Sequence, residues 1–233
     1  MSLPIAIIDA RAPTQAKEQL QKSFLLIEFL AKDIGYESLW GHPDVFMCTT
    51  DTKKLIIAPN TPEEIKHIFS KHTISYTEGN TTVDKDIQSS TAYNCIINKK
   101  YIFHKQSHTD PIIRTTFSNK KNIELPQAFS RCNMLCLPDG ACITSDRGIL
   151  KVLKTENIPH IYCSPKNILL PPYKHGCIGG TMGVYKNTIY IIGSLQTLEN
   201  GNVIKQFIHE HTCRHIELYD GALYDGGGIF FFE

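Results

Sequence analysis

The sequence lacks the features that mark a membrane span, a nucleic-acid-binding surface or a zinc ribbon. No apolar run reaches the roughly 18 residues that a membrane-spanning helix needs. The formal net charge is only +1, so no excess of basic residues attracts an anionic polymer or lipid surface. Eight cysteines are present, but no two are spaced as C-x-x-C, the usual zinc-ribbon pattern. We therefore expect no nucleic-acid partner, no membrane partner and no metal site.

The start of the chain also lacks the pattern of a secretory signal peptide. Residues 1–4 lead into a short apolar run, 5–8, and polar residues follow, without a basic segment or a long apolar stretch. We expect a cytoplasmic protein whose cysteines are reduced core residues rather than disulfides, because a chain of this length needs no covalent staples. Nothing in the sequence predicts a cofactor.

What is present is a repeat of a short strand, a polar turn, a second strand, a helix and a third strand. In the first copy, residues 45–48 and 55–57 are the expected strands around a turn at 49–54. Thr61 is the expected N-cap, with Pro62 at the first helical position, and residues 73–76 are the expected third strand. Three further copies begin at residues 93, 133 and 183. The turns Asp139-Gly140 and Lys186-Asn187 suit hairpins, because Gly and Asn tolerate positive φ.

A fifth copy is split between the two ends of the chain. Residues 228–232 read as a strand, while 5–8, 14–22 and 24–30 read as a strand, a helix and an apolar strand. Pairing the two ends would complete this copy and remove an exposed sheet edge. The pattern predicts an α/β fold, a five-bladed α/β-propeller of ββαβ repeats closed by the N- and C-terminal strands, with residues 1–233 as a single domain. The alternative is an open α+β sheet with coincidental repetition.

Several motifs occur in an order and spacing that resemble a known superfamily. They are His42–Phe46, Leu125–Met134, Ile143–Ile149, Gly179-Gly180, Tyr219–Leu223 and Asp220–Gly228. The chain resembles the pentein superfamily, the fold of guanidino-group-modifying enzymes (GME). It is most similar to an uncharacterised bacterial family of this fold, and more distantly to dimethylarginine dimethylaminohydrolases and amidinotransferases. The resemblance covers essentially the whole chain and implies the propeller.

The chemistry that the resemblance implies needs a Cys nucleophile, a His acid and base, and carboxylates that hold a guanidinium. At the nucleophile position this sequence has Asp225 or Phe231, depending on the relative used for the alignment. At the His position it has Gln127, and the acidic position falls near Cys48 or Thr49. These departures favour a catalytically degenerate protein that binds a small guanidino, amidino or other cationic ligand in the axial pocket.

In such a ring the first strand of each blade lines the axis, so residues at the starts of these strands converge. Asp225 precedes three glycines that permit a close backbone approach, which favours a site there. Asp44, like Asp110, could instead cap a turn, and the segment 145–148 could be an ion-paired turn as easily as part of the pocket. The expected ligand-binding residues are Asp44, Gln127, Cys132, Asp146, Asp225, Gly226, Gly227 and Gly228.

Two alternatives remain open. Cys132 could be a relocated nucleophile whose pKa is lowered by the neighbouring Arg131, which would make the protein a hydrolase of a guanidino or amidino C–N bond. The protein could also be a non-enzymatic scaffold for a protein partner. The histidines at 209, 211 and 215 are expected to be solvated rather than on a metal, with His215 beyond the helix, and 108–110 is expected to be a turn.

Overall fold

The computed structural model describes residues 3–49 and 55–233, which form a mixed α/β fold. Within that part of the chain, five sheets have three strands each and one has two. The three-stranded sheets, in spatial order, are β17 (Phe230–Phe232), β1 (Ile5–Asp9), β2 (Leu25–Phe29); β3 (Met47–Thr49), β4 (Leu55–Ile57), β5 (Tyr76–Glu78); β6 (Ile96–Ile97), β7 (Tyr101–His104), β8 (Lys121–Glu124); β9 (Met134–Cys136), β10 (Cys142–Thr144), β11 (His160–Tyr162); and β13 (Met182–Tyr185), β14 (Thr188–Ile191), β15 (Arg214–Glu217). The two-stranded sheet pairs β12 (Ile168–Leu169) with β16 (Leu223–Tyr224).

All five three-stranded sheets follow one pairing rule. The central strand is antiparallel to the first strand and parallel to the third. In the sheet at the chain ends, β17 takes the place of the first strand and pairs with β1 from Ile5↔Phe232 to Ile7↔Phe230. The predicted pairing of the two chain ends is therefore confirmed.

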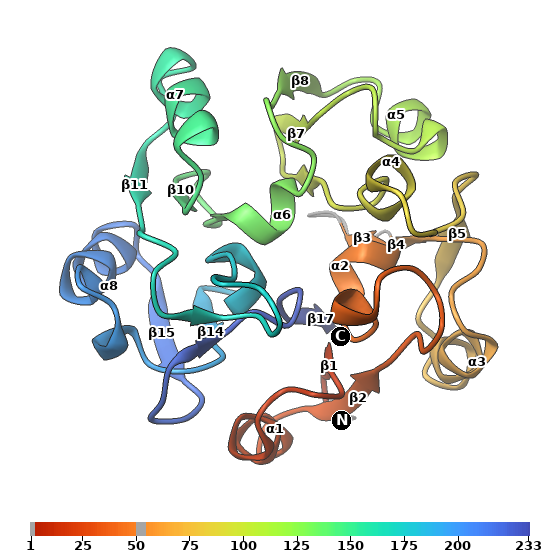
Figure 1. Ribbon diagram of the computed structural model, residues 1–233, viewed down its shortest axis with the longest axis horizontal. Helices are drawn as coiled ribbons and strands as arrows, with labels where there is room; N and C mark the ends of the chain where they lie inside the picture. The colour runs from red at the N-terminus through yellow and green to blue at the C-terminus, as the bar shows by residue number, and fades with distance from the viewer. Residues whose placement is uncertain (1–2, 50–54) are drawn as a thin grey trace.

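The parallel pairs require crossover connections, and a helix supplies each of them. These helices are α1 (Thr14–Gln21), α3 (Glu63–Lys71), α5 (Pro111–Thr116), α7 (Arg147–Thr155) and α8 (Gly201–Glu210). Figure 1 shows the five units following one another around a common centre, with these helices on the outside and both chain ends in the same unit. The sheets stay separate, and no single closed sheet joins the described strands.

Three first strands begin later than the sequence predicts. The strand expected at residue 93 begins at Ile96 as β6, and a helical turn precedes each of the other two. Residues 43–46 form α2 (Pro43–Phe46), so β3 begins at Met47 rather than at residue 45. Residues 130–133 form α6 (Ser130–Asn133), so β9 begins at Met134. The error has a physical reason, since a short apolar run suits a buried helical turn as well as a strand.

The first repeat contains two further corrections. Pro62 rather than Thr61 is the N-cap of α3, and the Thr61 hydroxyl donates to the carbonyl of Ala58 (2.8 Å). Thr73 has a positive φ of 57°, so the expected strand at 73–76 begins only at Tyr76. Most of the expected turn at 49–54 lies outside the described residues. In the hairpin at 186–187 the positive φ belongs to Lys186 (55°).

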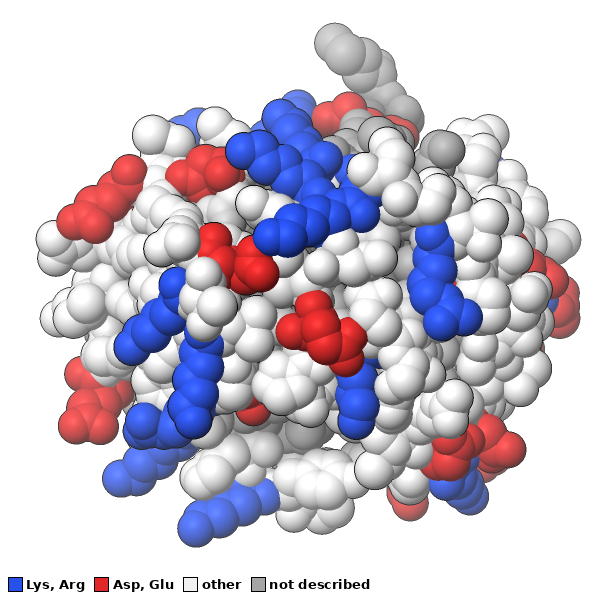
Figure 2. Space-filling model, turned by 90° about the horizontal axis from the view of Figure 1, so that it is seen from above, with Lys and Arg blue, Asp and Glu red and all other residues white. Residues whose placement is uncertain are grey.

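Apolar side chains fill the spaces between the sheets and the outer helices. The largest of these core clusters joins the first and second repeats to β17 and includes the buried Phe46, Phe69 and Phe230. All eight cysteines are free thiols, six of them buried and two half-buried. No helix in the described part of the chain is long and apolar enough to cross a membrane. Figure 2 shows basic and acidic side chains interspersed over one face, as the nearly balanced charge predicts.

Candidate functional site

Buried polar residues gather at the centre, where the chain turns into the first strand of several units. Asp44 lies in α2 before β3, Asn94 precedes β6, and Cys132 lies in α6 before β9. Asp225 follows β16 and stands shortly before β17. The exposed fractions of these four residues range from 0% to 4%, so their side chains are shielded from solvent.

The thiol of Cys132 connects two of these turns. It donates a hydrogen bond to Asp44 Oδ2 (2.9 Å), and Asn94 Nδ2 approaches Cys132 Sγ at 3.2 Å. Asn94 Oδ1 accepts from the backbone N–H groups of Arg131 (2.8 Å) and Cys132 (3.2 Å). The Asn94 amide therefore positions both the start of α6 and the thiol that α6 carries.

Arg131 extends from α6 toward the first strands of the neighbouring units. Its Nη1 donates to the carbonyl of Gly179 (2.9 Å) and lies 4.0 Å from Asp44 Oδ2, while Nη2 approaches the carbonyl of Met182 at 3.3 Å. The guanidinium also lies over the ring of Phe230, 4.8 Å from its centroid. These contacts fix the cation at the centre of the molecule.

Asp225 is held by backbone donors rather than by a cation. Its Oδ2 accepts from the N–H of Cys177 (2.8 Å) and its Oδ1 from the N–H of Gly227 (3.2 Å). A side chain on Gly180 would overlap this carboxylate, which explains the glycine there. Burial raises the pKa of Asp225 to about 6, and the neighbouring His42 opposes that rise.

His42 lies against these carboxylates and is 1% exposed. Its Nδ1 is 3.9 Å from Asp44 Oδ1, beyond hydrogen-bond distance. Neither ring nitrogen of His42, nor Asp44 Oδ1, has a hydrogen-bond partner among the described residues. Burial lowers the pKa of His42 and raises the pKa of Asp44, which favours the neutral form of both.

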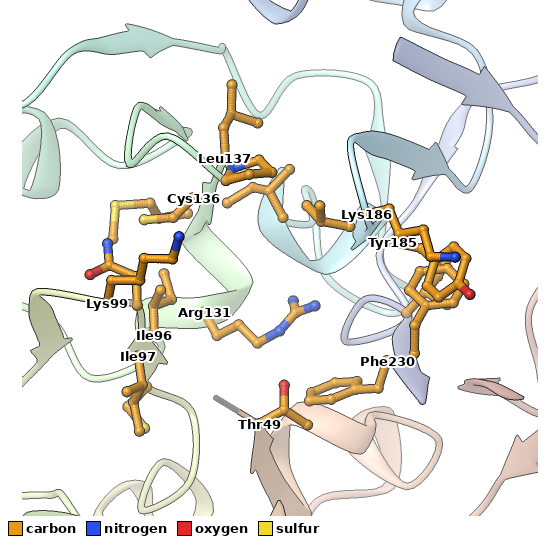
Figure 3. Close-up of a pocket in the computed structure, with 18 of the residues that line it drawn as sticks. Thr49, Ile96, Ile97, Lys99, Arg131, Cys136, Leu137, Tyr185, Lys186 and Phe230 are labelled. Carbon is orange, nitrogen blue, oxygen red and sulfur yellow. The ribbon is translucent and has the colours of Figure 1, made fainter. Parts of the chain in front are cut away.

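A cavity of about 460 Å³ adjoins this buried centre. Its walls come from the first strands of several units, including β3, β6, β9, β13 and β17, and are mostly aliphatic and aromatic. Figure 3 shows the Arg131 side chain reaching toward the middle of the cavity, between Phe230 and the wall that carries Lys99. Lys186 and Glu233 also line the cavity, 3.6 Å apart at their charged atoms.

The structure brings together part of the set expected from the sequence. Asp44, Cys132, Asp225 and the glycines 226–228 lie at the buried centre, with the N–H of Gly227 on the Asp225 carboxylate. None of the eight expected ligand-binding residues is among the described residues that line the cavity, so the expectation that they face it is not met. Gly228 has a φ of 78°, and a side chain there would overlap the Arg131 guanidinium.

The remaining expected residues lie elsewhere or have another contact. Asp146 caps α7 by accepting from the N–H of Ile149 (2.7 Å). Gln127 is half-buried in the loop between β8 and α6, where its carbonyl approaches the Ser130 hydroxyl at 3.3 Å. Asp110 caps α5, as the sequence suggested.

The pKa of Cys132 is shifted in the opposite direction from the one that a nucleophile needs. Burial, followed by the nearby Asp44 and Asp225, raises the pKa of this thiol well above its usual value. The expected lowering by Arg131 is wrong, because the guanidinium bonds to carbonyls and lies beside Asp44. Cys132 is a neutral thiol that donates a hydrogen bond.

Sequence reasoning missed His42, Asn94 and Arg131 as members of the centre. Each lies two to five residues before the first strand of its repeat, as Asp44 and Cys132 do. Their common position, just before the first strand of a repeat, is the sequence signal that could have identified them.

Comparison with known proteins identifies the fold without identifying the activity. No curated protein matches the chain in sequence. Among solved structures, agmatine deiminase from C. jejuni matches with a TM-score of 0.59 and 9% identity, over 100% of this chain and 94% of that one. Dimethylarginine dimethylaminohydrolase from Pseudomonas aeruginosa matches with a TM-score of 0.55 and 8% identity, over 97% and 94%. An amidinotransferase of the saxitoxin pathway from Microseira wollei matches with a TM-score of 0.54 and 9% identity, over 97% and 90%.

These solved structures are pentein-fold proteins, so the resemblance seen in the sequence is confirmed at the level of the fold. At identities of 8–9% the match shows a shared fold and says nothing about a shared activity. A family profile matches residues 7–230, almost the whole chain. The chain belongs to the family of unknown function DUF6873.

Proposed function

We propose that this chain is a single-domain, five-bladed α/β-propeller that binds a small molecule in its central cavity and does not hydrolyse guanidino compounds. Five sheets with one pairing rule, arranged around a common centre, support the propeller. Gln127, Asp225 and Phe231 at the positions where the resemblance requires His and Cys support the absence of hydrolysis.

The Arg131 guanidinium in the cavity is the main observation in favour of an acidic ligand (Figure 3). Lys99 and Lys186 also line the cavity, and Glu233 is the one acidic side chain among its described lining residues. The rest of the wall is mostly apolar. An aliphatic or aromatic body with a carboxylate or another acidic group is the ligand that such a wall complements, because guanidinium groups bind carboxylates in a bidentate geometry.

A cationic or guanidino ligand is the second candidate, favoured by the buried carboxylates of Asp44 and Asp225. Two observations weigh against it. Both carboxyl groups are at most 1% exposed, and burial raises the pKa of both, which weakens their negative charge. A cation entering the cavity would also meet Arg131 before it reached them.

A matched pair of probes separates the two ligand classes. Phenylacetate and phenethylamine share an aromatic body and differ in the sign of their charge. We expect phenylacetate to raise the melting temperature and phenethylamine, arginine, agmatine and methylated arginines to leave it unchanged, since binding to the folded state alone stabilises it. Lys99→Gln should reduce the phenylacetate shift without changing the melting temperature of the free protein. Stabilisation by agmatine or arginine instead would establish the second candidate.

The proposal also excludes turnover of guanidino substrates. Incubation with arginine, agmatine or methylated arginines should give no citrulline-type product above background. Product formation that a Cys132→Ala substitution abolished would refute this part of the proposal and establish Cys132 as a relocated nucleophile.

A further inference from the structure

Three side chains at the buried centre offer different donor atoms to a common point. His42 and Asp44 come from the turn into β3, and Cys132 comes from the turn into β9. One imidazole nitrogen, one carboxylate oxygen and the sulfur all lie within 4.8 Å of one another. The three residues are 1%, 0% and 4% exposed, and none of them lines the cavity described above.

The hydrogen bonding of this group is incomplete in the described structure. Both ring nitrogens of His42 and one oxygen of Asp44 are buried without a partner. A buried polar group without a partner costs about 1–3 kcal/mol, so such groups in a folded protein call for an explanation.

We propose that His42, Asp44 and Cys132 bind a divalent transition-metal ion, with zinc as the ion that this donor set fits. Zinc binds imidazole nitrogen, thiolate sulfur and carboxylate oxygen, and three protein ligands leave a fourth position for water. The mixture of a soft thiolate with imidazole and carboxylate disfavours magnesium and calcium, which take oxygen ligands.

The distances require only small adjustments. Cys132 Sγ and Asp44 Oδ2 are 2.9 Å apart, and His42 Nδ1 and Asp44 Oδ1 are 3.9 Å apart. Two ligand atoms on a tetrahedral zinc are roughly 3.3–3.6 Å apart, given metal–ligand bonds of about 2.0–2.3 Å. These two pairs need to move by less than about an ångström, and the donor atoms of His42 and Cys132 lie within 4.8 Å of each other, a separation that side-chain rotation can reduce.

The neighbouring residues already support such a site. Asn94 Nδ2 approaches Cys132 Sγ at 3.2 Å and also the backbone carbonyl of Asp44 at 3.2 Å. Hydrogen bonds of this kind orient metal ligands and are part of a metal site.

Metal binding would replace the hydrogen bond between Cys132 and Asp44. The S–H bond breaks, its proton passes to solvent, and the sulfur lone pair forms the bond to the metal. If the Asp44 carboxyl is protonated, its proton leaves as well. No group is oxidised or reduced, and affinity should fall as the pH is lowered, because protons compete with the metal.

Cobalt(II) is the sharpest probe, because its spectrum reports its ligands. The full chain is treated with chelator, dialysed and titrated with Co²⁺ or Zn²⁺. We expect saturation at one ion per chain, a thiolate-to-cobalt charge-transfer band in the near ultraviolet, visible bands typical of tetrahedral cobalt, and a higher melting temperature. Zn²⁺ should displace the cobalt spectrum.

Variants then assign the ligands. Cys132→Ser should abolish the charge-transfer band. Both Cys132→Ser and His42→Gln should weaken zinc binding by more than about tenfold. Cys163→Ser is the matched control, since Cys163 is also buried but lies in an apolar cluster, where its thiol hydrogen-bonds to the carbonyl of Ser164 (3.3 Å). It should leave both the spectrum and the affinity unchanged.

The wild-type spectrum tests the proposal even if a variant fails to fold. Absence of the thiolate band and of any metal-induced thermal shift in the folded wild-type protein would overturn the proposal. A cobalt spectrum that survived in folded Cys132→Ser protein would also overturn it, and would point to other thiols. Neither result depends on phenylacetate binding, so failure here is distinguishable from failure of the proposed cavity ligand.

Discussion

His104 in the second repeat and His42 at the centre are both buried, yet only His104 has partners for its ring. His104 Nδ1 pairs with the Thr109 hydroxyl (2.7 Å) and Nε2 with the carbonyl of Ala128 (2.9 Å). His42 has a partner at neither nitrogen within the described structure. Burial lowers the pKa of both rings, so charge does not distinguish them.

Each of these histidines is followed in its repeat by a buried aspartate, and the two aspartates differ in the same way. Asp110 is buried and accepts hydrogen bonds from the N–H groups of Asn80 (2.8 Å), Thr81 (2.7 Å) and Ile112 (2.8 Å). Asp44 is equally buried but accepts only the Cys132 thiol at one oxygen, while its other oxygen has no partner in the described residues. A buried polar group with all its partners stabilises a loop, whereas one without them points to a missing ligand. On this comparison Asp110 stabilises a loop, and Asp44 is the candidate for binding a ligand.

The largest expected effect comes from making the same isosteric change at both aspartates. Asp110→Asn places an amide NH₂ where backbone N–H groups require an acceptor, and it should lower the free energy of unfolding by about 3 kcal/mol. Asp44→Asn keeps an acceptor for the Cys132 thiol and removes a poorly paired carboxyl group, so its effect should stay within about 1 kcal/mol in chelator-treated protein. Urea unfolding at pH 7.5 measures both. Equal losses would show that Asp44 is as well satisfied as Asp110.

The pH dependence of stability gives the second test. The pKa of His104 is lowered from its usual 6.5 to about 4, so between these values the unfolded state binds a proton that the folded state does not. Stability should therefore fall by about 3 kcal/mol as the pH drops through this window, and His104→Gln should remove that loss.

Asp225 should show the opposite sign in an overlapping window. Its pKa is raised from 3.8 to about 6, so between these values the folded state binds a proton that the unfolded state does not. Its contribution to stability increases as the pH falls, by about 3 kcal/mol over the window. Asp225→Asn should therefore make the protein lose more stability on acidification, whereas His104→Gln should make it lose less. Unfolding at pH 7.5 and at pH 5 distinguishes these signs, and matching changes in the two variants would contradict both assignments.

A third test applies one substitution to the two histidines at a pH above both windows. At pH 8 in chelator-treated protein, His104→Gln should cost about 2 kcal/mol, because it disturbs two satisfied hydrogen bonds. His42→Gln removes a ring with no partner and should cost less than about 1 kcal/mol beyond the change in packing. A larger loss at His42 than at His104 would contradict the structural distinction between them.

The order of elements was predictable from the sequence, because apolar runs and turn residues recur in the same order in each repeat. The pairing of the chain ends followed from the same repeat, since 228–232 supplies the strand that the amino-terminal copy lacks, but the register of that pairing did not. The helical turns at 43–46 and 130–133 were not predictable from apolar pattern alone, and they decide which side chains face the centre. Asp44, Cys132 and Asp225 were found because they stand at strand starts. The sequence carries no local signal that His42 lacks partners or that Asn94 spans two turns, since both depend on contacts between distant segments.

The smallest expected effect concerns the reactivity of Cys132, and it tests what the unpaired His42 does. If His42 acted as a general base, it would take the thiol proton and Cys132 would be a reactive thiolate. The structure indicates the opposite, because burial lowers the pKa of His42 and burial with two nearby carboxyl groups raises the pKa of Cys132.

Native chelator-treated protein exposed to iodoacetamide at pH 8 should therefore be alkylated first at the half-buried Cys136, and at Cys132 only when it unfolds. Peptide mass spectrometry over a time course measures the order, with urea-unfolded protein as the control in which all eight thiols react. Rapid alkylation of Cys132 in the folded state would show a thiolate at the centre. His42 would then act as the base that activates the Cys132 nucleophile. It would differ from His104 by a catalytic role rather than by binding a metal.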